Sequence, residues 1–202
     1  MSILAINTVN IGSSIAIIED NGNCFIERNF IDHSHGETFF QILNTLFDRY
    51  GYNYDKIKYL VVVVGPGSFT GIRAGISAAQ GINLVTNKPL CGVNALEVQA
   101  YAISILYTNN KKNIRAIIKN NRGFYTQLFN FDLLPLSEPV LASKAMISSY
   151  ETTNNNDITY MDCDLPDLDA SYAGLLVRYK LENKQKLNEV DALYLNELQY
   201  MK

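Results

Sequence analysis

Paired cysteines are missing from this chain of 202 residues. Its three cysteines, Cys24, Cys91 and Cys163, lie far apart and form no Cys-x-x-Cys pair. An odd, scattered set argues against a disulfide framework and against a thiolate zinc site, and it fits a reducing compartment. We therefore expect the chain to reside in the cytoplasm.

A surplus of positive charge is missing as well, since 17 basic residues stand against 20 acidic ones and the formal net charge is -3. Binding of nucleic acid depends on clustered Lys and Arg that neutralise phosphates, so we expect no strong binding without a partner. The one basic concentration favours a charged, solvated strand edge over a patch that contacts nucleic acid. Its members are Lys111, Lys112, Arg115, Lys119 and Arg122.

The N-terminal stretch has no basic region and no long apolar run, and its short apolar segment 3–6 leads straight into Asn7. A secretory signal needs a basic start and a longer apolar core, and a membrane-spanning helix needs about 20 apolar residues. We therefore expect neither a signal peptide nor a membrane span.

Histidine is scarce, with two copies. Asp32, His33, His35 and Glu37 lie close together and offer carboxylate and imidazole groups. Their spacing is unconvincing for a metal site, and the chain has no His-x-x-x-His pair, so we expect no bound metal. The segment is better interpreted as the entry to a helix, with Ser34 or Glu37 supporting the first turn.

The most informative segment runs from Val61 to Gly75. It opens with four consecutive valines, which cannot alternate between core and solvent and therefore predict a strand buried on both faces, as in parallel sheets. A glycine-rich turn and the start of a helix follow. The turn then lies at the carboxyl end of the strand, where open α/β sheets usually meet ligands and partners.

Known glycine motifs do not fit this turn. A Walker phosphate loop needs Gly-Lys-Ser/Thr, but Ile72 follows Gly71, and the dinucleotide fingerprint needs a third glycine where Thr70 stands. A nucleophile elbow around Ser68 would need glycines where Pro66 and Thr70 stand. We therefore expect no catalytic residue here.

Small residues recur every four positions in the helix that follows, at Gly67, Gly71, Gly75 and Ala79. Such a strip lets another segment approach closely, either inside one domain or between two molecules, and the spacing leaves both interpretations open. The intermolecular interpretation predicts that Gly75→Leu abolishes partner binding while leaving the fold largely intact.

Hydrophobic periodicity divides the chain into two loosely equivalent halves, each opening with antiparallel strands and ending in strand–helix units. Expected strands lie near 3–6, 13–18, 25–30, 61–64, 115–119, 124–131 and 158–161, and expected helices near 38–50, 94–106, 143–150 and 170–181. The pattern suggests the two-lobed α/β fold of ribonuclease-H-like, actin-type ATPases (ASKHA), in which each lobe is a mixed sheet flanked by helices. We place an N-terminal lobe at residues 1–106 and a reduced C-terminal lobe at 107–202.

The run Gly65–Arg73, with the sequence GPGSFTGIR, closely resembles the bacterial TsaB (YeaZ) family. The similarity extends over nearly the whole chain and includes Leu4–Thr8, His35–Glu37 and Leu193–Leu195. It implies a non-catalytic subunit that dimerises with and activates the catalytic paralogue TsaD. With the ATPase TsaE, such a complex forms threonylcarbamoyladenosine next to the anticodon of tRNA, and tRNA is reached only through the complex.

The resemblance also implies where the partner binds, because the family pairs through its first two helices. This favours the intermolecular interpretation of the small-residue strip. The implied partner interface consists of Gly67, Ser68, Phe69, Thr70, Gly71, Arg73, Gly75, Ala78 and Ala79. The resemblance implies that this chain has no catalytic residue and no metal ligand.

The chain departs from the family pattern at Asn7, where an aspartate usually precedes Thr8. The equivalent carboxylate in ATPases of this superfamily helps to hold metal-bound nucleotide, and an amide carries no charge. We therefore interpret Asn7 and Thr8 as a remnant nucleotide loop and expect no firmly bound cofactor, with ATP or ADP only at the subunit junction of the complex. The segment 120–125 only partly matches an acidic family turn, and Asn196 stands where an arginine is common.

Two alternatives stay open. The first is a small actin-like ATPase or kinase, which magnesium-dependent turnover of ATP would support. The second is a stand-alone homodimeric scaffold that uses the same helix strip, and mixing the chain with TsaD separates it from the favoured interpretation.

Overall fold

The computed structural model describes residues 2–10, 12–29, 35–107, 112–153, 157–161, 167–195 and 198–199. The chain divides into two compact units: unit 1 comprises Met1–Ala95 and Asp169–Leu193, and unit 2 comprises Leu96–Leu168 and Tyr194–Lys202. The expected lobes, 1–106 and 107–202, differ from these units. Helix α3 (Ala95–Leu106) lies almost wholly in unit 2, and α5 (Ala170–Glu182) lies in unit 1.

Unit 1 is built on a five-stranded mixed sheet with the order β3-β2-β1-β4-β5. The first three strands form an antiparallel meander, and β1, β4 and β5 run parallel. Their bounds are β1 Ser2–Asn7, β2 Ser13–Glu19, β3 Cys24–Asn29, β4 Tyr59–Val63 and β5 Leu90–Val93. The valine run therefore forms β4, beside the central strand β1.

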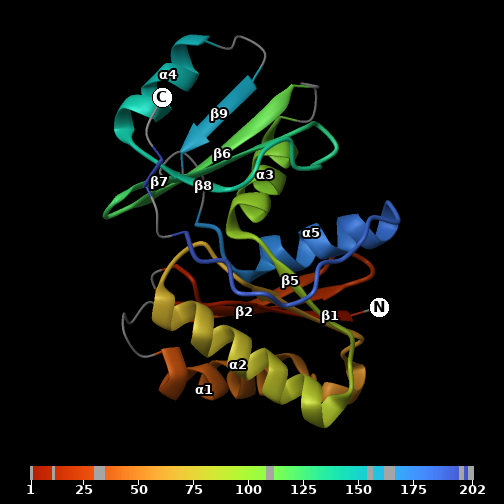
Figure 1. Ribbon diagram of the computed structural model, residues 1–202. Helices are drawn as coiled ribbons and strands as arrows, with labels where there is room; N and C mark the ends of the chain where they lie inside the picture. The colour runs from red at the N-terminus through yellow and green to blue at the C-terminus, as the bar shows by residue number, and fades with distance from the viewer. Residues whose placement is uncertain are drawn as a thin grey trace. The chain divides into compact units, whose positions relative to one another are not determined.

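Helices cover both faces of this sheet (Figure 1). On one face α1 (His35–Tyr50) and α2 (Phe69–Thr86) pack on alternate residues of the strands, including Leu4, Ile17 and Val62. Helix α5 packs closely on the other face. This is possible because position 174 is a glycine, and a Cβ there would lie only 2.7 Å from the side chain of Ile18. A short 3-10 helix, η1 (Tyr54–Lys56), precedes β4. Burial on both faces explains why the valines do not alternate with polar residues.

Unit 2 contains a second five-stranded mixed sheet, with the order β10-β8-β7-β6-β9. The bounds are β6 Asn113–Asn120, β7 Gly123–Phe129, β8 Val140–Ala142, β9 Asp157–Met161 and β10 Leu198–Gln199. Helix α4 (Lys144–Thr153) packs on one face through Ile147, which joins a small core with Ile117 and Ala142. The buried amide of Gln99 on α3 donates to the carbonyl oxygen of Ile117 at 2.9 Å. The expected fold class, with a mixed sheet and flanking helices in each lobe, is confirmed.

Three short strands of the described chain, β5, β8 and β10, were not predicted from sequence. Strand β5 has only four residues, and Cys91 and Gly92 interrupt its apolar pattern. It forms because it extends the parallel side of the unit 1 sheet, with Leu60 paired to Leu90. Tertiary pairing, rather than local propensity, decides such short strands.

Several sequence expectations lie outside the described residues. Asp32 and His33 are among them, as are Cys163 and Asn196. Cys24 is exposed and Cys91 is buried, and neither forms a disulfide with another described residue. None of the described helices is both long and apolar enough to cross a bilayer.

Candidate partner-binding surface on helix α2

The turn between β4 and α2 is shaped by close contacts with its own unit. Gly65 has a φ of +112°, which strongly favours glycine, and a Cβ there would lie 2.5 Å from the carbonyl oxygen of Leu193. The backbone N–H of Ser68 donates to the carbonyl oxygen of Val9 at 2.9 Å. The hydroxyl of Ser68 then caps α2 by accepting from the N–H of Gly71 at 3.2 Å. Ser68 is therefore the N-cap residue of α2.

The small-residue strip of α2 faces inward, against the segment that follows β1. A Cβ at Gly71 would lie 1.9 Å from the carbonyl oxygen of Thr8, and one at Gly75 would lie 2.3 Å from the Thr8 hydroxyl oxygen. A Cβ at Gly67 would lie 2.4 Å from the carbonyl oxygen of Val9. The strip thus serves close packing inside unit 1, one of the two interpretations that its spacing left open. Gly75→Leu would disrupt this packing, so the mutant is no clean probe of partner binding.

Thr8 is fully buried, and its hydroxyl donates to the carbonyl oxygen of Gly71 at 2.6 Å. The side-chain oxygen of Asn7, itself nearly buried, accepts from the N–H of Val9 at 3.2 Å. The side chains of Asn7 and Thr8, the expected remnant nucleotide loop, therefore both form hydrogen bonds within unit 1. Neither fits a metal-bound phosphate, because one is an uncharged amide and the other points its hydroxyl into α2.

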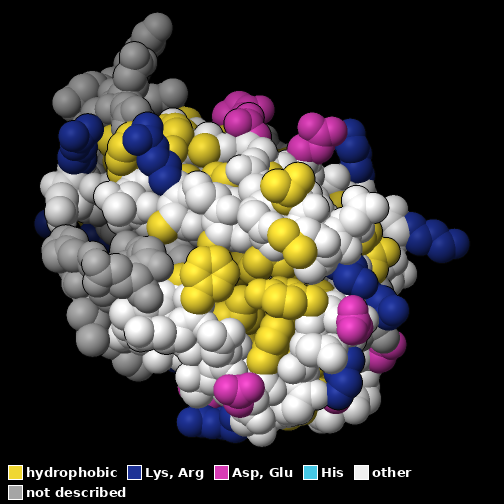
Figure 2. All heavy atoms as spheres, turned by 90° about the horizontal axis from the view of Figure 1, so that it is seen from below, with side chains coloured by type: hydrophobic (Ala, Val, Ile, Leu, Met, Phe, Trp, Pro, Cys, Tyr) yellow, Lys and Arg dark blue, Asp and Glu magenta, His cyan; other side chains and the backbone are white. Residues whose placement is uncertain are grey.

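The outward side of α2 is exposed and carries large apolar side chains at the two ends of the helix, with polar residues between them. Phe69 is 53% exposed, Leu84 85% and Val85 86%. The guanidinium carbon of Arg73 lies 3.9 Å from the centre of the Phe69 ring, which is a cation–π arrangement. A positive charge therefore lies beside this apolar ring. Helix α1, which contacts α2, adds the half-exposed ring of Phe40. Figure 2, which views the side of unit 1 that carries α1 and α2, shows hydrophobic side chains gathered across the middle of the face.

The expected interface residues therefore divide between two faces of one helix. Ser68, Phe69, Thr70 and Arg73 are exposed, whereas Gly71, Gly75 and Ala79 are buried and Gly67 and Ala78 are half-buried. Sequence reasoning missed Phe40, Leu84 and Val85. A helical projection gives a signal for two of them, since Leu84 and Val85 fall away from the buried side of α2. The role of these residues in partner binding stays a prediction.

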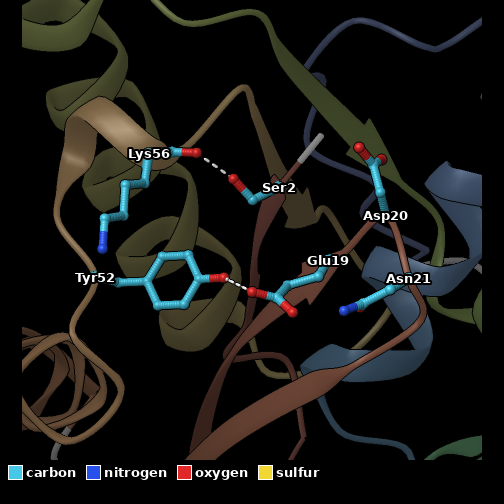
Figure 3. Close-up of a pocket in the computed structure, with 6 residues that line it drawn as sticks. All are labelled: Ser2, Glu19, Asp20, Asn21, Tyr52 and Lys56. Atoms are coloured by element: carbon cyan, nitrogen blue, oxygen red, sulfur yellow. Dashed lines mark hydrogen bonds between the residues drawn. The ribbon is translucent and has the colours of Figure 1, made fainter.

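A pocket of about 330 Å³ lies at the opposite end of β1, lined by Ser2, Glu19, Asp20, Asn21, Tyr52 and Lys56 (Figure 3). The Tyr52 hydroxyl donates to the carboxylate of Glu19, and this bond lowers the pKa of Glu19. Burial, followed by the neighbouring carboxylate, raises the pKa of Tyr52 to about 12. At neutral pH the pair is therefore an ionised acceptor and a protonated donor, which suits a fixed structural bond rather than proton transfer.

The basic residues singled out in the sequence do not share one exposed edge. Arg115 is buried, and its guanidinium carbon lies 3.8 Å from the centre of the Tyr150 ring. Its strand, β6, lies between β7 and β9, so the interpretation as a strand edge is wrong for Arg115. Lys119 and Arg122 are exposed, and Lys111 lies outside the described residues. No three His, Cys, Asp or Glu side chains gather as a metal site among the residues that the structure describes.

Sequence similarity to known proteins covers part of the chain. The family model of the tRNA N6-adenosine threonylcarbamoyltransferase TsaD matches residues 29–114. The tRNA threonylcarbamoyladenosine biosynthesis protein TsaB of Escherichia coli is 33% identical over 50% of this chain and 43% of its own length. The protein of the same name from Bacillus subtilis is 27% identical over 50% of this chain and 44% of its own. The matched stretch thus spans less than half of these curated relatives.

The fold similarity covers nearly the whole chain. The solved structure of YeaZ from Pseudomonas aeruginosa superposes with a TM-score of 0.74 over 96% of this chain and 99% of that one, at 16% sequence identity. The chain is therefore similar to TsaB (YeaZ) proteins, in sequence over about half of its length and in fold over nearly all of it.

Proposed function

We propose that this chain is a non-catalytic subunit of the machinery that forms threonylcarbamoyladenosine next to the anticodon of tRNA, and that it dimerises with and activates a TsaD-type catalytic partner. The similar TsaB proteins of Escherichia coli and Bacillus subtilis are named for the biosynthesis of threonylcarbamoyladenosine in tRNA, which supports this pathway for the chain. The match of residues 29–114 to the TsaD family model supports a partner of related fold. The observation that carries the proposal is the set of exposed apolar side chains at the two ends of α2, a helix whose other side packs within unit 1.

The contact surface proposed for the partner is this outward face together with α1. Phe69, Leu84 and Val85 supply apolar area, and Arg73 supplies a cation over the face of the Phe69 ring. Large apolar side chains held in water on one face of a helix pair are typical of protein interaction sites. The glycine strip contributes indirectly, because it fixes the position of α2 on the unit 1 sheet.

The absence of catalysis by this chain alone is supported by the state of the Asn7–Thr8 loop. Its amide and hydroxyl are engaged within unit 1, and neither side chain carries a negative charge to hold magnesium. We propose that ATP or ADP, together with the ATPase TsaE, acts only in the assembled complex, and that tRNA is reached through the partner. The cytoplasm is the proposed location of this assembly.

Reconstitution tests the proposal. The TsaD-type protein of the same organism, with TsaE and the remaining pathway components, is assayed for threonylcarbamoyladenosine in unmodified tRNA with and without this chain. We expect modification to depend on the chain, whereas the chain without TsaD forms none. Full modification in the absence of the chain would contradict the proposal. Magnesium-dependent hydrolysis of ATP by the chain alone would favour the actin-like ATPase instead.

A further inference from the structure

Gly81 is the one glycine of α2 whose position the packing of unit 1 does not explain. Gly71 and Gly75 are required where they stand, because a Cβ at either position would collide with Thr8. A Cβ at Gly81 would meet no atom within 4 Å. A glycine inside a helix lowers the stability of the helix relative to alanine, and at Gly81 no contact within the chain offsets that loss. The open space at Gly81 is therefore available to another molecule.

The side chains around Gly81 turn this open space into a hole in the surface of α2. On a helix, the residues at positions i, i+3, i+4 and i+7 surround one hole, into which a side chain of a facing helix inserts as a knob. All four residues of one such hole are exposed on α2, namely Ser77, Gln80, Gly81 and Leu84. Val85, which is 86% exposed, adds an apolar wall one turn after the glycine. Because Gly81 has no side chain, the helix backbone is the floor of the hole, which leaves room for a large apolar knob.

The charge of α2 restricts the chemistry of the segment that fits there. Helix α2 contains no acidic residue, and Arg73 is its single charged side chain. Arg73 stacks on Phe69 and forms no ion pair with any residue that the structure describes. It stands eight residues before Gly81, which is about 12 Å along the helix axis. A segment that carries a carboxylate about 12 Å from a large apolar side chain therefore complements this surface.

We propose that a helix of the TsaD-type partner crosses α2 at Gly81, inserts a large apolar side chain beside Leu84 and directs a carboxylate at Arg73. This inference rests on the proposed function, because it names the residue of α2 over which that partner packs. A helix is the favoured occupant, since a hole of this pattern receives the side chains of a facing helix. The single cation on α2 disfavours nucleic acid, which needs clustered positive charge. The TsaD family model matches residues 29–114, which include α2, and this supports a partner of related fold.

Substitutions at Gly81 test the proposal with the full chain and the TsaD-type protein of the same organism. In isothermal titration calorimetry, Gly81→Leu is expected to raise the dissociation constant roughly tenfold or more because leucine fills the hole, and Gly81→Ala to raise it by less. Thermal melting of the free chain should change in the opposite direction, since both residues favour a helix more than glycine does. A weaker complex formed by a more stable chain cannot result from unfolding. Ala145→Leu, which adds bulk at an exposed position of α4, is the control and should leave binding unchanged.

Substitutions at Arg73 test the carboxylate contact in the same titration. Arg73→Glu is expected to weaken binding more than Arg73→Ala, and Arg73→Lys to retain part of the affinity, with differences that shrink as salt is added. A wild-type chain that binds while Gly81→Leu binds equally well would overturn this inference and leave the proposed function standing. Equal binding by Arg73→Glu and the wild type would likewise overturn the carboxylate contact alone. A wild-type chain that does not bind the TsaD-type protein would overturn both the inference and the proposed function.

Discussion

Gly71 and Gly81 lie in the same helix, yet an added methyl group meets very different surroundings at the two positions. A Cβ at Gly71 would lie 1.9 Å from the carbonyl oxygen of Thr8, whereas one at Gly81 meets nothing within 4 Å. We predict that Gly71→Ala destabilises the chain by roughly 1–3 kcal/mol or more, because backbone would have to move. Gly81→Ala should instead stabilise it by about 1 kcal/mol through helix propensity. Urea denaturation of both variants measures the two free energies of unfolding.

Equal effects of the two substitutions would contradict the packing of Thr8 against α2. The pair is a matched control, since both variants make the same chemical change in one helix. A loss of stability at Gly71 alone would also indicate that a bulky residue at Gly75, which packs on the same Thr8, destabilises the fold. Any effect of such a residue on partner binding would then be indirect.

The bond between Tyr52 and Glu19 is the largest cause of the lowered pKa of Glu19. We predict that Tyr52→Phe raises this pKa toward its ordinary value of 4.5, measured by NMR titration of the Glu19 carboxyl carbon. Asn23→Ala, which removes a second bond to the same carboxylate at 2.9 Å, should raise the pKa by less. A carboxyl whose pKa is depressed in the folded state stabilises the fold above its unfolded pKa, and that contribution is lost as the pH falls through the folded pKa. An unchanged pKa in Tyr52→Phe would show that the bond does not persist in solution.

At the scale of elements, α2 shows what a sequence pattern can and cannot predict. The four-residue spacing of Gly67, Gly71 and Gly75 correctly predicts a close approach, because small residues have few other uses in a helix. The identity of the approaching segment depends on the position of Thr8, which is distant in the sequence and follows a different strand. The direction in which the strip faces therefore could not be read from its spacing.

Helix α5 shows the same limit. Its fully buried residues Leu176 and Val177 mark an amphipathic helix, but nothing local tells which sheet the helix covers. Because the chain returns from unit 2 before α5 forms, a boundary drawn at residue 106 assigned this helix to the second lobe. In the structure it covers β1, β2 and β4 of unit 1.

We predict that Leu176→Ala lowers the free energy of unfolding by about 2–5 kcal/mol, because it leaves a cavity between α5 and the unit 1 sheet. The exposed Leu84→Ala should change it by less than about 0.5 kcal/mol. Hydrogen exchange then locates the effect. Faster exchange is expected in β1 and β2, and a loss of protection confined to β6 and β7 would show that α5 stabilises the other unit.

At the scale of the whole molecule, the buried valine strand and the N-terminal meander could be predicted from runs and alternations of hydrophobic residues. The short strands β5, β8 and β10 could not, because pairing with distant strands decides them. The outward face of α2 was predicted only in part. Phe69 and Arg73 lie in the conspicuous glycine-rich run, whereas Leu84 and Val85 stand far along the helix, where exposure is known only once the buried side is fixed. One side of α2 thus packs within unit 1, and the other side is exposed.

Binding of a TsaD-type partner through α2 is tested most directly by light-scattering chromatography. The chain is mixed with the TsaD-type protein of the same organism, with and without ATP. We predict a new one-to-one complex for the wild type and its loss for Leu84→Glu combined with Val85→Glu, because two charges would enter an apolar contact. Leu106→Glu, a control at another exposed apolar position, should bind like the wild type. Separate wild-type peaks, or a complex that survives the double substitution on α2, would contradict the account.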